Sequence, residues 1–242
     1  MASARCSEAE QHYPMSRLDH IETWIFDLDN TLYPPSCRLF EQVDQRMGTF
    51  ICELLKLEPA EARALQKRYM KEFGTTLRGL MVNHQCPPER FLEHVHAIDY
   101  SVIEPDQRLG AALACLRGRK LIFTNGSVPH AERVLERVGI AHHFNGVFDI
   151  VAAGYWPKPK MSAYEGLIRT HAVEPKRAAL IEDLPRNLIP AAALGMTTVL
   201  VKTDSEWAQE HATGDHIHHV TEDLAGWLAE AAACLTLERA AD

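Results

Sequence analysis

The spacing of apolar residues changes twice along the chain. Ile21 to Phe26 is a short apolar run that ends in two aspartates and turn-forming residues, which is typical of a buried strand. From Leu39 to Leu55, apolar residues recur every three or four positions, as on one face of an amphipathic helix. Two more helices are predicted from Pro59 and after Pro87–Pro88, with a short segment bracketed by Gly74 and Gly79. Residues from about 37 to 104 are therefore predicted to be all-helical.

Strands and helices then alternate through the rest of the chain. Strands are predicted at 120–125, 147–151, 178–181, 197–201 and 216–220. Between them, helices are predicted at 109–116, 130–138, from Ser162 with the capping-box spacing to Glu165, at 188–194 and near 224–228. Alternation of this kind predicts a parallel, doubly wound α/β sheet with right-handed crossovers.

The predicted organisation is a sheet domain interrupted by a helical one. Residues 1–18 are polar and lack periodicity, which predicts a loose tail. Residues 19–36 and 105–242 form the α/β core, and residues 37–104 form an inserted helical domain. A long helical connection packed on the same core is the alternative.

Polar side chains follow several of the predicted strands, and in a parallel sheet these strand ends share one edge. The first strand ends in Asp27 and Asp29, and the second in Thr124 and Asn125. The loop after the third carries Lys158, with Lys160 as a competitor. The fourth ends in Glu182 and Asp183, with Asn187 four residues beyond Asp183. Each of these is common in turns or on solvated loops when taken alone.

Together these residues suit the chemistry of a phosphate ester. Clustered carboxylates favour Mg²⁺, which also binds substrate phosphate. A hydroxyl, backbone amides and a lysine suit the remaining phosphate oxygens. One carboxylate can attack phosphorus, and a second can act as general acid and then as general base.

Composition removes other classes of function. The 242 residues carry a net charge of −8, which argues against a nucleic-acid polymer as partner. Neither a Gly-x-Gly-x-x-Gly strand end nor a P-loop occurs. Without a signal-like or membrane-spanning segment, and with six scattered cysteines, the chain is expected to be cytoplasmic with reduced thiols. The histidines at 216–219 match no zinc-site spacing and are expected to be solvated.

Four stretches of the chain resemble, in order, the four motifs of the haloacid dehalogenase-like (HAD) superfamily. They are Phe26-Asp-Leu-Asp-Asn-Thr-Leu-Tyr33, Ile122-Phe-Thr-Asn-Gly-Ser127, Lys158-Pro159 and Ile181-Glu-Asp-Leu-Pro-Arg-Asn187. The resemblance covers about residues 21–202 and implies a Rossmann-like parallel sheet core with an inserted helical cap.

The same resemblance implies roles for individual residues. It makes Asp27 the nucleophile and Asp29 the acid/base, with Thr124, Asn125 and Lys158 at the phosphate. It implies Mg²⁺ on the Asp27 carboxylate, the Asp29 backbone carbonyl and Asp183. Glu182 stands where the superfamily often has Gly or Asp. Glu182 and Asn187 are therefore expected to support the metal indirectly.

The presence of Asp29 argues against the haloacid dehalogenase branch, which lacks this second carboxylate. The segment Lys71 to His84 is similar to the cap of the pyrimidine 5′-nucleotidase branch, which implies UMP or CMP as substrate. Arg78, Asn83 and His84 are the polar candidates for recognising the leaving group.

Three alternatives remain open at this point. The chain is a phosphatase for another small phosphorylated metabolite, a phosphomutase, or a degenerate HAD domain that only binds. The last would be marked by loss of Asp27 or Asp29, and both are present. Monomer and homodimer are both compatible with the sequence.

Overall fold

A computed structural model describes residues 18–204, 208 and 210–238. Its strands form one sheet in the order β3-β2-β1-β4-β5-β6, and every neighbouring pair is parallel. The strands are β1 Thr23–Phe26, β2 Arg119–Phe123, β3 Gly146–Phe148, β4 Ala178–Glu182, β5 Thr197–Val201 and β6 His219–Thr221. The strand order runs outward in both directions from β1, so the predicted Rossmann-like α/β core is confirmed.

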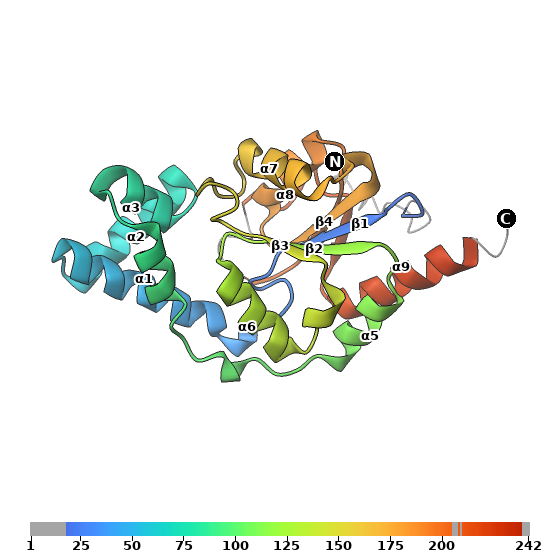
Figure 1. Cartoon of the computed structure of the whole chain (residues 1–242), viewed down its shortest axis with the longest axis horizontal. Coiled ribbons are helices and arrows are strands. Elements are labelled where there is room, and N and C mark those ends of the chain that lie inside the picture. Colours follow the sequence, from blue (N-terminus) through green and yellow to red (C-terminus); the bar gives the residue numbers. More distant parts are fainter. Residues whose placement is uncertain (1–17, 205–207, 209, 239–242) are drawn as a thin grey trace, which may run out of the picture.

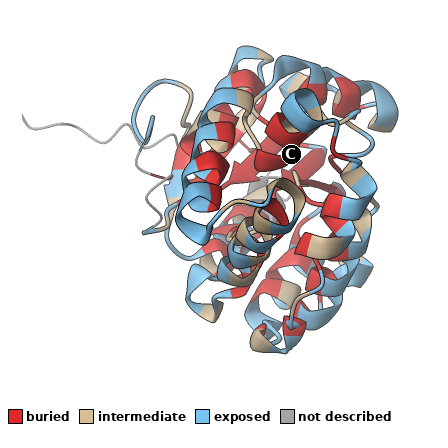
Figure 2. Cartoon of the chain, turned by 90° about the vertical axis from the view of Figure 1, so that its left-hand side faces the viewer, coloured by how far each residue is buried: buried red, intermediate tan, exposed pale blue. Residues whose placement is uncertain are grey.

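Helices cover both faces of this sheet (Figure 1). One face carries α5 Gln107–Cys115, α6 Val128–Val138 and α9 Leu224–Glu238, and the other carries α7 Met161–His171 and α8 Pro185–Ala193. Residues of the strands are buried between these layers, while the outer faces of the helices are exposed (Figure 2). Because both faces are covered, the strand residues between the two layers are mostly apolar, and the charged residues Arg119, Lys120 and Glu182 lie at strand ends.

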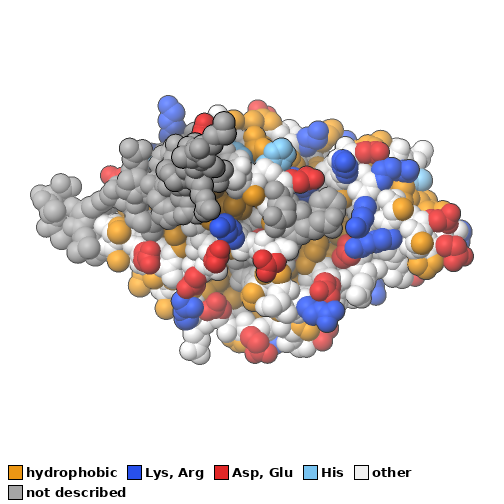
Figure 3. Space-filling model, turned by 180° about the vertical axis from the view of Figure 1, so that it is seen from behind, with side chains coloured by type: hydrophobic (Ala, Val, Ile, Leu, Met, Phe, Trp, Pro, Cys, Tyr) orange, Lys and Arg blue, Asp and Glu red, His pale blue; other side chains and the backbone are white. Residues whose placement is uncertain are grey.

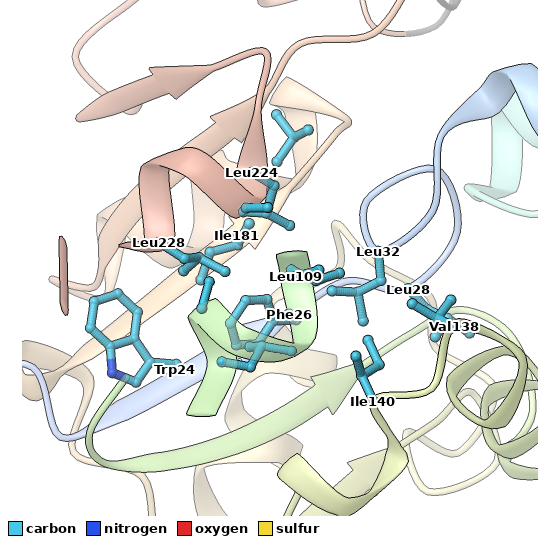
Figure 4. Packing of buried hydrophobic residues seen from close by; sticks show 14 of the residues in the cluster. Trp24, Phe26, Leu28, Leu32, Leu109, Val138, Ile140, Ile181, Leu224 and Leu228 are labelled. Carbon is cyan, nitrogen blue, oxygen red and sulfur yellow. The ribbon is translucent and has the colours of Figure 1, made fainter. Parts of the chain in front are cut away.

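The central strand β1 serves both faces of the sheet. Trp24 and Phe26 point into the cluster with α5, α6 and α9, where Figure 4 shows them among Leu109, Ile181 and Leu228. Ile25 points the opposite way, into the cluster with α7 and α8. Successive side chains of a strand point to opposite faces, so this short run ties both helical layers to the sheet.

Four helices lie between β1 and α5 in the chain, and we call them the helical unit: α1 Leu39–Leu55, α2 Pro59–Phe73, α3 Thr76–His84 and α4 Pro88–Val95. They lie beside one end of the sheet, at the left of Figure 1. Phe50, Leu80 and Phe91 belong to a hydrophobic cluster of this unit, distinct from the two clusters of the sheet. Ile150, from the loop after β3, packs into the same cluster and joins the unit to the core.

Three local predictions were wrong in detail. Gly79 lies inside α3 instead of ending a segment, because Tyr69 of α2 packs where a side chain at Gly79 would stand. Ser162 is not an N-cap, since α7 begins at Met161 after Lys160. The third strand ends at Phe148, because Asp149 and the residues after it form a turn that carries Ile150 to the helical unit.

Other expectations concern the ends and surface of the molecule. The predicted tail lies outside the described residues except for Leu18, which is buried in the core. In the described part of the chain, every helix is too short or too polar to span a bilayer. Lysine, arginine, aspartate and glutamate side chains are interspersed on the face that Figure 3 shows. The described cysteines, Cys37, Cys52, Cys86, Cys115 and Cys234, are free.

The close packing at Gly79 makes a testable prediction. A Cβ atom at Gly79 would lie 2.3 Å from Cγ of Tyr69, so Gly79→Ala forces α2 and α3 apart. We expect it to lower the free energy of unfolding by about 1–3 kcal/mol. Gly110→Ala in α5 is the matched control, because its nearest neighbour, Cγ2 of Ile140, would be 3.8 Å away. That variant should gain up to about 1 kcal/mol from helix propensity. Urea unfolding followed by circular dichroism measures both, and equal effects would contradict the packing argument.

Candidate active site

Asp27 stands at the end of the central strand. Its backbone N–H donates to the Ile181 carbonyl at 2.9 Å, which extends the β1–β4 pairing by one residue. Leu28 turns into the core, and Asp27 and Asp29 on either side of it line a cavity at the edge of the sheet. Asn30 then takes a left-handed conformation, with φ of 61°, that reverses the chain. The alternation of a strand therefore brings the two carboxylates to the same side.

Lys158 binds three acceptors at this edge. Its Nζ donates to Oδ1 of Asp27 at 2.7 Å, to Oε2 of Glu182 at 2.6 Å and to the Phe123 carbonyl at 2.7 Å. The side chain is 1% exposed. Burial alone lowers the pKa of an ammonium, but the charges of Asp27 and Glu182 outweigh it and raise the pKa of Lys158. Lys158 is therefore a charged cation, while Lys160 is exposed and does not line the cavity.

Asn125 and Thr124 shape the loop that delivers Lys158. The Asn125 side-chain oxygen accepts from the Lys158 backbone N–H at 2.8 Å, and its amide nitrogen donates to the Lys158 carbonyl at 3.3 Å. The Thr124 hydroxyl accepts from the Gly126 backbone N–H at 2.9 Å and lines the cavity. The Asn125 side chain therefore positions Lys158.

Three buried carboxylates meet beside Lys158. Asp27, Glu182 and Asp183 each place an oxygen within 4.8 Å of those of the other two. Burial and then the charge of Glu182 raise the pKa values of both Asp27 and Asp183. Three carboxylates against one ammonium leave a formal charge of −2 at this spot.

These donors fit a hard divalent cation. Carboxylate oxygens around a net negative charge are what Mg²⁺ prefers in proteins. Asn187 supplies a further observation, because its buried Oδ1 accepts no hydrogen bond although the residue lines the cavity. Glu182 is already occupied on both oxygens, by Lys158 and by the Leu184 backbone N–H at 3.2 Å. Asp27 likewise accepts on both oxygens, from Lys158 and from the Thr31 hydroxyl, so hydrogen bonding does not single out one of the three carboxylates as a ligand.

Asp29 has different partners from Asp27. Its Oδ1 accepts from the Tyr33 hydroxyl at 2.6 Å and is 2.8 Å from Nε2 of His130. Burial by itself raises the pKa of Asp29, but His130 and then the Tyr33 hydrogen bond reverse this and lower the pKa. The pKa values of Asp27 and Asp29, which are only two residues apart, are therefore shifted in opposite directions.

A cavity of about 440 Å³ extends from these residues to the helical unit. Its far wall is largely apolar and contains Phe40, Val43, Met47, Met70, Phe91, Leu92 and Val95. The ion pair of Arg63 with Asp44 also lines it, as does His96. Because the wall opposite the carboxylates belongs to the helical unit, that unit must contact whatever part of a ligand lies beyond them.

The structure does not bring the three cap candidates into this cavity lining. The Arg78 guanidinium lies 3.9 Å over the Trp156 ring, and the Asn83 amide donates to the Gly79 carbonyl. The His84 Nε2 is 2.7 Å from the Tyr69 hydroxyl. All three are on α3 or its last turn, and their polar groups have partners within or beside the helical unit.

Sequence reasoning missed several polar residues that line the cavity, among them Asp44, Arg63, His96 and His130. His130 had a usable signal. It lies in the first turn of α6, directly after the Thr124–Gly126 strand end, and such a helix begins at the same edge as the site. Asp44 and Arg63 had none, because the sequence pattern does not show which polar residues of α1 and α2 face the sheet.

The histidines at 216–219 belong to another part of the sheet. The Thr198 backbone N–H donates to Nδ1 of His218 at 3.0 Å, and the Thr198 hydroxyl donates to the His216 carbonyl. The His219 ring packs edge-on against Trp227. Among the described residues, the cluster with metal-ligand geometry is the acidic one, which contains no histidine.

A family model for haloacid dehalogenase-like hydrolases matches residues 21–195. The chain belongs to this family. The matched span contains both carboxylates after β1, Thr124, Lys158 and the acidic end of β4. Members are hydrolases, so the chain is a HAD-family hydrolase.

Individual relatives match this chain at low identity or over a short stretch. Phosphate metabolism protein 8 of Saccharomyces cerevisiae is 28% identical over 215 residues, which cover 81% of this chain and 66% of the yeast protein. Enolase-phosphatase E1 of Frankia alni is 38% identical over 73 residues, covering 30% of this chain and 29% of that protein. The chain thus spans slightly less than two thirds of the yeast relative and much less of the other.

Solved structures share the fold. An L-2-haloacid dehalogenase from Xanthobacter autotrophicus, with chloropropionic acid covalently bound, gives a TM-score of 0.53 at 15% identity, covering 89% of this chain and 98% of that one. A HAD-hydrolase from Bacillus subtilis bound to magnesium gives 0.54 at 13% identity, covering 86% and 96%. At these identities the likeness shows the fold alone.

The acidic cluster predicts a stabilising effect of Mg²⁺. At a concentration of about 100 times Kd, a ligand of the folded state adds roughly 2.7 kcal/mol, which raises Tm by about 5–10 °C for a chain of this size. Asp183→Asn should reduce this rise to less than about 2 °C. It should also leave the metal-free protein at least as stable, because the raised pKa of Asp183 means that its charge opposes folding above the usual carboxyl range.

Differential scanning fluorimetry with and without Mg²⁺ measures both effects. Asp204→Asn is the matched control, since Asp204 is exposed and outside the cluster, and it should keep the full rise. An unchanged Mg²⁺ response in Asp183→Asn would exclude Asp183 as a ligand.

Proposed function

We propose that this hydrolase is a Mg²⁺-dependent phosphomonoesterase that acts through an aspartyl-phosphate on Asp27. The observation that carries the proposal is the buried carboxylate of Asp27, held between Lys158 and the Thr31 hydroxyl, which donates at 3.0 Å. A carboxylate fixed on both oxygens at the end of the central strand is oriented for attack on a bound phosphorus atom. The names of the yeast and Frankia relatives, which refer to phosphate metabolism and to a phosphatase, support the same chemistry.

In the first step an Asp27 carboxylate oxygen forms a bond to phosphorus and the bond to the leaving oxygen breaks. Asp29 supplies the proton that the leaving oxygen needs. In the second step Asp29 takes a proton from water, the water oxygen attacks phosphorus, and the bond to Asp27 breaks. Phosphate is released and both carboxylates return to their first state.

The surrounding residues control charge during these steps. Lys158 neutralises Asp27 and stabilises the oxygens of the transferring group. Asp27 and Asp183 would hold Mg²⁺ together with the Asp29 backbone carbonyl, and the bound ion would neutralise the phosphate charge. The Thr124 hydroxyl and the backbone amide of Asn125 would bind the remaining phosphate oxygens. Glu182 and Asn187 support this arrangement, Glu182 through its contact with Lys158.

We further propose that the substrates are pyrimidine nucleoside 5′-monophosphates, UMP or CMP. The motif Asp-Asn-Thr-Leu-Tyr-Pro and the segment Lys71 to His84 are similar to that branch of the family. The cavity supports a leaving group larger than water, and aromatic side chains such as Phe40 and Phe91 suit a planar base. Because Arg78, Asn83 and His84 do not line it, base recognition falls to other residues of the helical unit.

Asp27→Asn tests the covalent mechanism. The substitution keeps the size of the side chain and an acceptor for Lys158 but removes the nucleophile, so turnover should fall at least about 1,000-fold. The Tm should stay within a few degrees of that of the unaltered chain. Acid-quenched enzyme should carry hydroxylamine-labile phosphate during turnover, and the variant should not. Normal UMP hydrolysis by the variant would rule out Asp27 as nucleophile.

A phosphate-release screen tests the substrate. UMP, CMP, purine nucleotides, sugar phosphates and small phosphorylated metabolites are compared with and without Mg²⁺. We expect UMP or CMP to give a kcat/KM at least about 10-fold above the others, a difference of about 1.4 kcal/mol in transition-state binding. A faster ester of another class would replace the nucleotide assignment and leave the phosphatase assignment intact. Substrate loss without equivalent free phosphate would identify a mutase.

A further inference from the structure

His130 contacts the carboxylate to which the proposed function gives proton transfer. Its Nε2 lies 2.8 Å from Oδ1 of Asp29, and the Tyr33 hydroxyl donates to the same oxygen. The other oxygen, Oδ2, takes part in neither contact. A Cβ atom built on Gly126 would lie 3.8 Å from Oδ2 and 3.3 Å from the Thr124 hydroxyl, so Oδ2 faces the strand end that lines the cavity.

His130 is itself held on several sides. Its Nδ1 lies 2.9 Å from the Tyr100 hydroxyl, and its ring stacks on that of His96 with centroids 4.3 Å apart and planes 11° from parallel. The side chain is 1% exposed. With a partner on each ring nitrogen and a second ring against its face, the imidazole cannot turn away from Asp29 without breaking one of these contacts.

The partners of His130 come from the segment that returns from the helical unit to the sheet. His96 follows the end of α4, and Tyr100 begins a short 3-10 helix, Tyr100–Val102. The Tyr100 hydroxyl also reaches the His96 carbonyl at 3.1 Å, and the Ser127 hydroxyl is 2.9 Å from Nδ1 of His96. Tyr33 lies on the segment that leaves the sheet for the helical unit. One connection therefore contacts Asp29 through Tyr33, and the other contacts His130, which in turn contacts Asp29.

We propose that His130 is a positioning residue for Asp29, and that Tyr100 and His96 hold it in place from the returning connection. By fixing Oδ1, His130 and Tyr33 keep Oδ2 directed at the leaving oxygen of the substrate. The role rests on the proposed function, since it serves proton transfer by Asp29. This positioning role predicts that replacing His130 lowers kcat/KM most for substrates whose leaving oxygen must be protonated.

Two phosphate esters distinguish a role of His130 in positioning Asp29 from a purely structural role. The alkoxide that leaves UMP must be protonated, whereas p-nitrophenolate is stable as an anion and leaves without help. The ratio of the two kcat/KM values, measured with Mg²⁺ on one preparation, does not depend on how much of the protein is folded. A variant that only lowers stability leaves this ratio unchanged.

His130→Leu should lower kcat/KM for UMP roughly 10- to 100-fold and that for p-nitrophenyl phosphate less than about 3-fold. His130→Gln can replace Nε2 by an amide N–H and should recover most of the activity on UMP. Tyr100→Phe removes the hydroxyl beside Nδ1 and should lower the ratio about 3- to 10-fold. Tyr155→Phe is the matched control, because its hydroxyl donates to Glu89 at 3.0 Å, outside this network, and it should not change the ratio.

Equal losses on both esters in His130→Leu would overturn the positioning role while leaving the phosphatase assignment in place. Failure of His130→Gln to exceed His130→Leu on UMP would also overturn it. Turnover of neither ester by the unaltered chain would remove the proposed function, and the positioning role with it.

Discussion

The buried contact of Lys158 with Asp27 and Glu182 is the interaction on which the rest of the site depends. Carboxylates this deeply buried are costly unless a cation and hydrogen bonds compensate them. Lys158 provides that compensation and, through the Phe123 carbonyl, links the ends of β1, β2 and β4. Asn125 fixes the backbone of Lys158 and so joins the loop after β3 to the same point. The four segments that contain the proposed site residues are thereby held to one another.

Lys158 neutralises only part of the negative charge of these carboxylates, and the charge that remains suits a metal ion. Asp183 adds a third carboxylate, so the cluster keeps a negative charge that a divalent cation can neutralise. The carboxylate of Asp29 is held by Tyr33 and His130 instead of by Lys158. The pKa of Asp27 is raised and that of Asp29 is lowered, which is the reverse of the usual order for a nucleophile and a general acid; a cation bound beside Asp27 would lower the pKa of Asp27.

The helical unit completes the cavity without contributing to the acidic cluster. Its wall is mostly apolar and faces the carboxylates, while its two connections to the sheet reach Asp29 through Tyr33 and through His130. In the proposed mechanism, the part of the molecule that would contact the leaving group would also orient Asp29, the residue proposed to protonate it.

The strands, the helices and the grouping of the main site residues could be predicted from the sequence alone, because they depend on the order of residues along the chain. The spacing of apolar residues determined which segments become strands and helices, and parallel strands place their last side chains at one edge, so Asp27, Thr124, Lys158 and Asp183 could be grouped in advance. Only the tertiary structure decided which polar groups of the helices reach the cavity. Arg78, Asn83 and His84 have the right chemistry but contact Trp156, Gly79 and Tyr69 instead. Asp44 and Arg63 face the cavity because helix rotation and packing set that direction, and residue spacing along one helix does not reveal its neighbour.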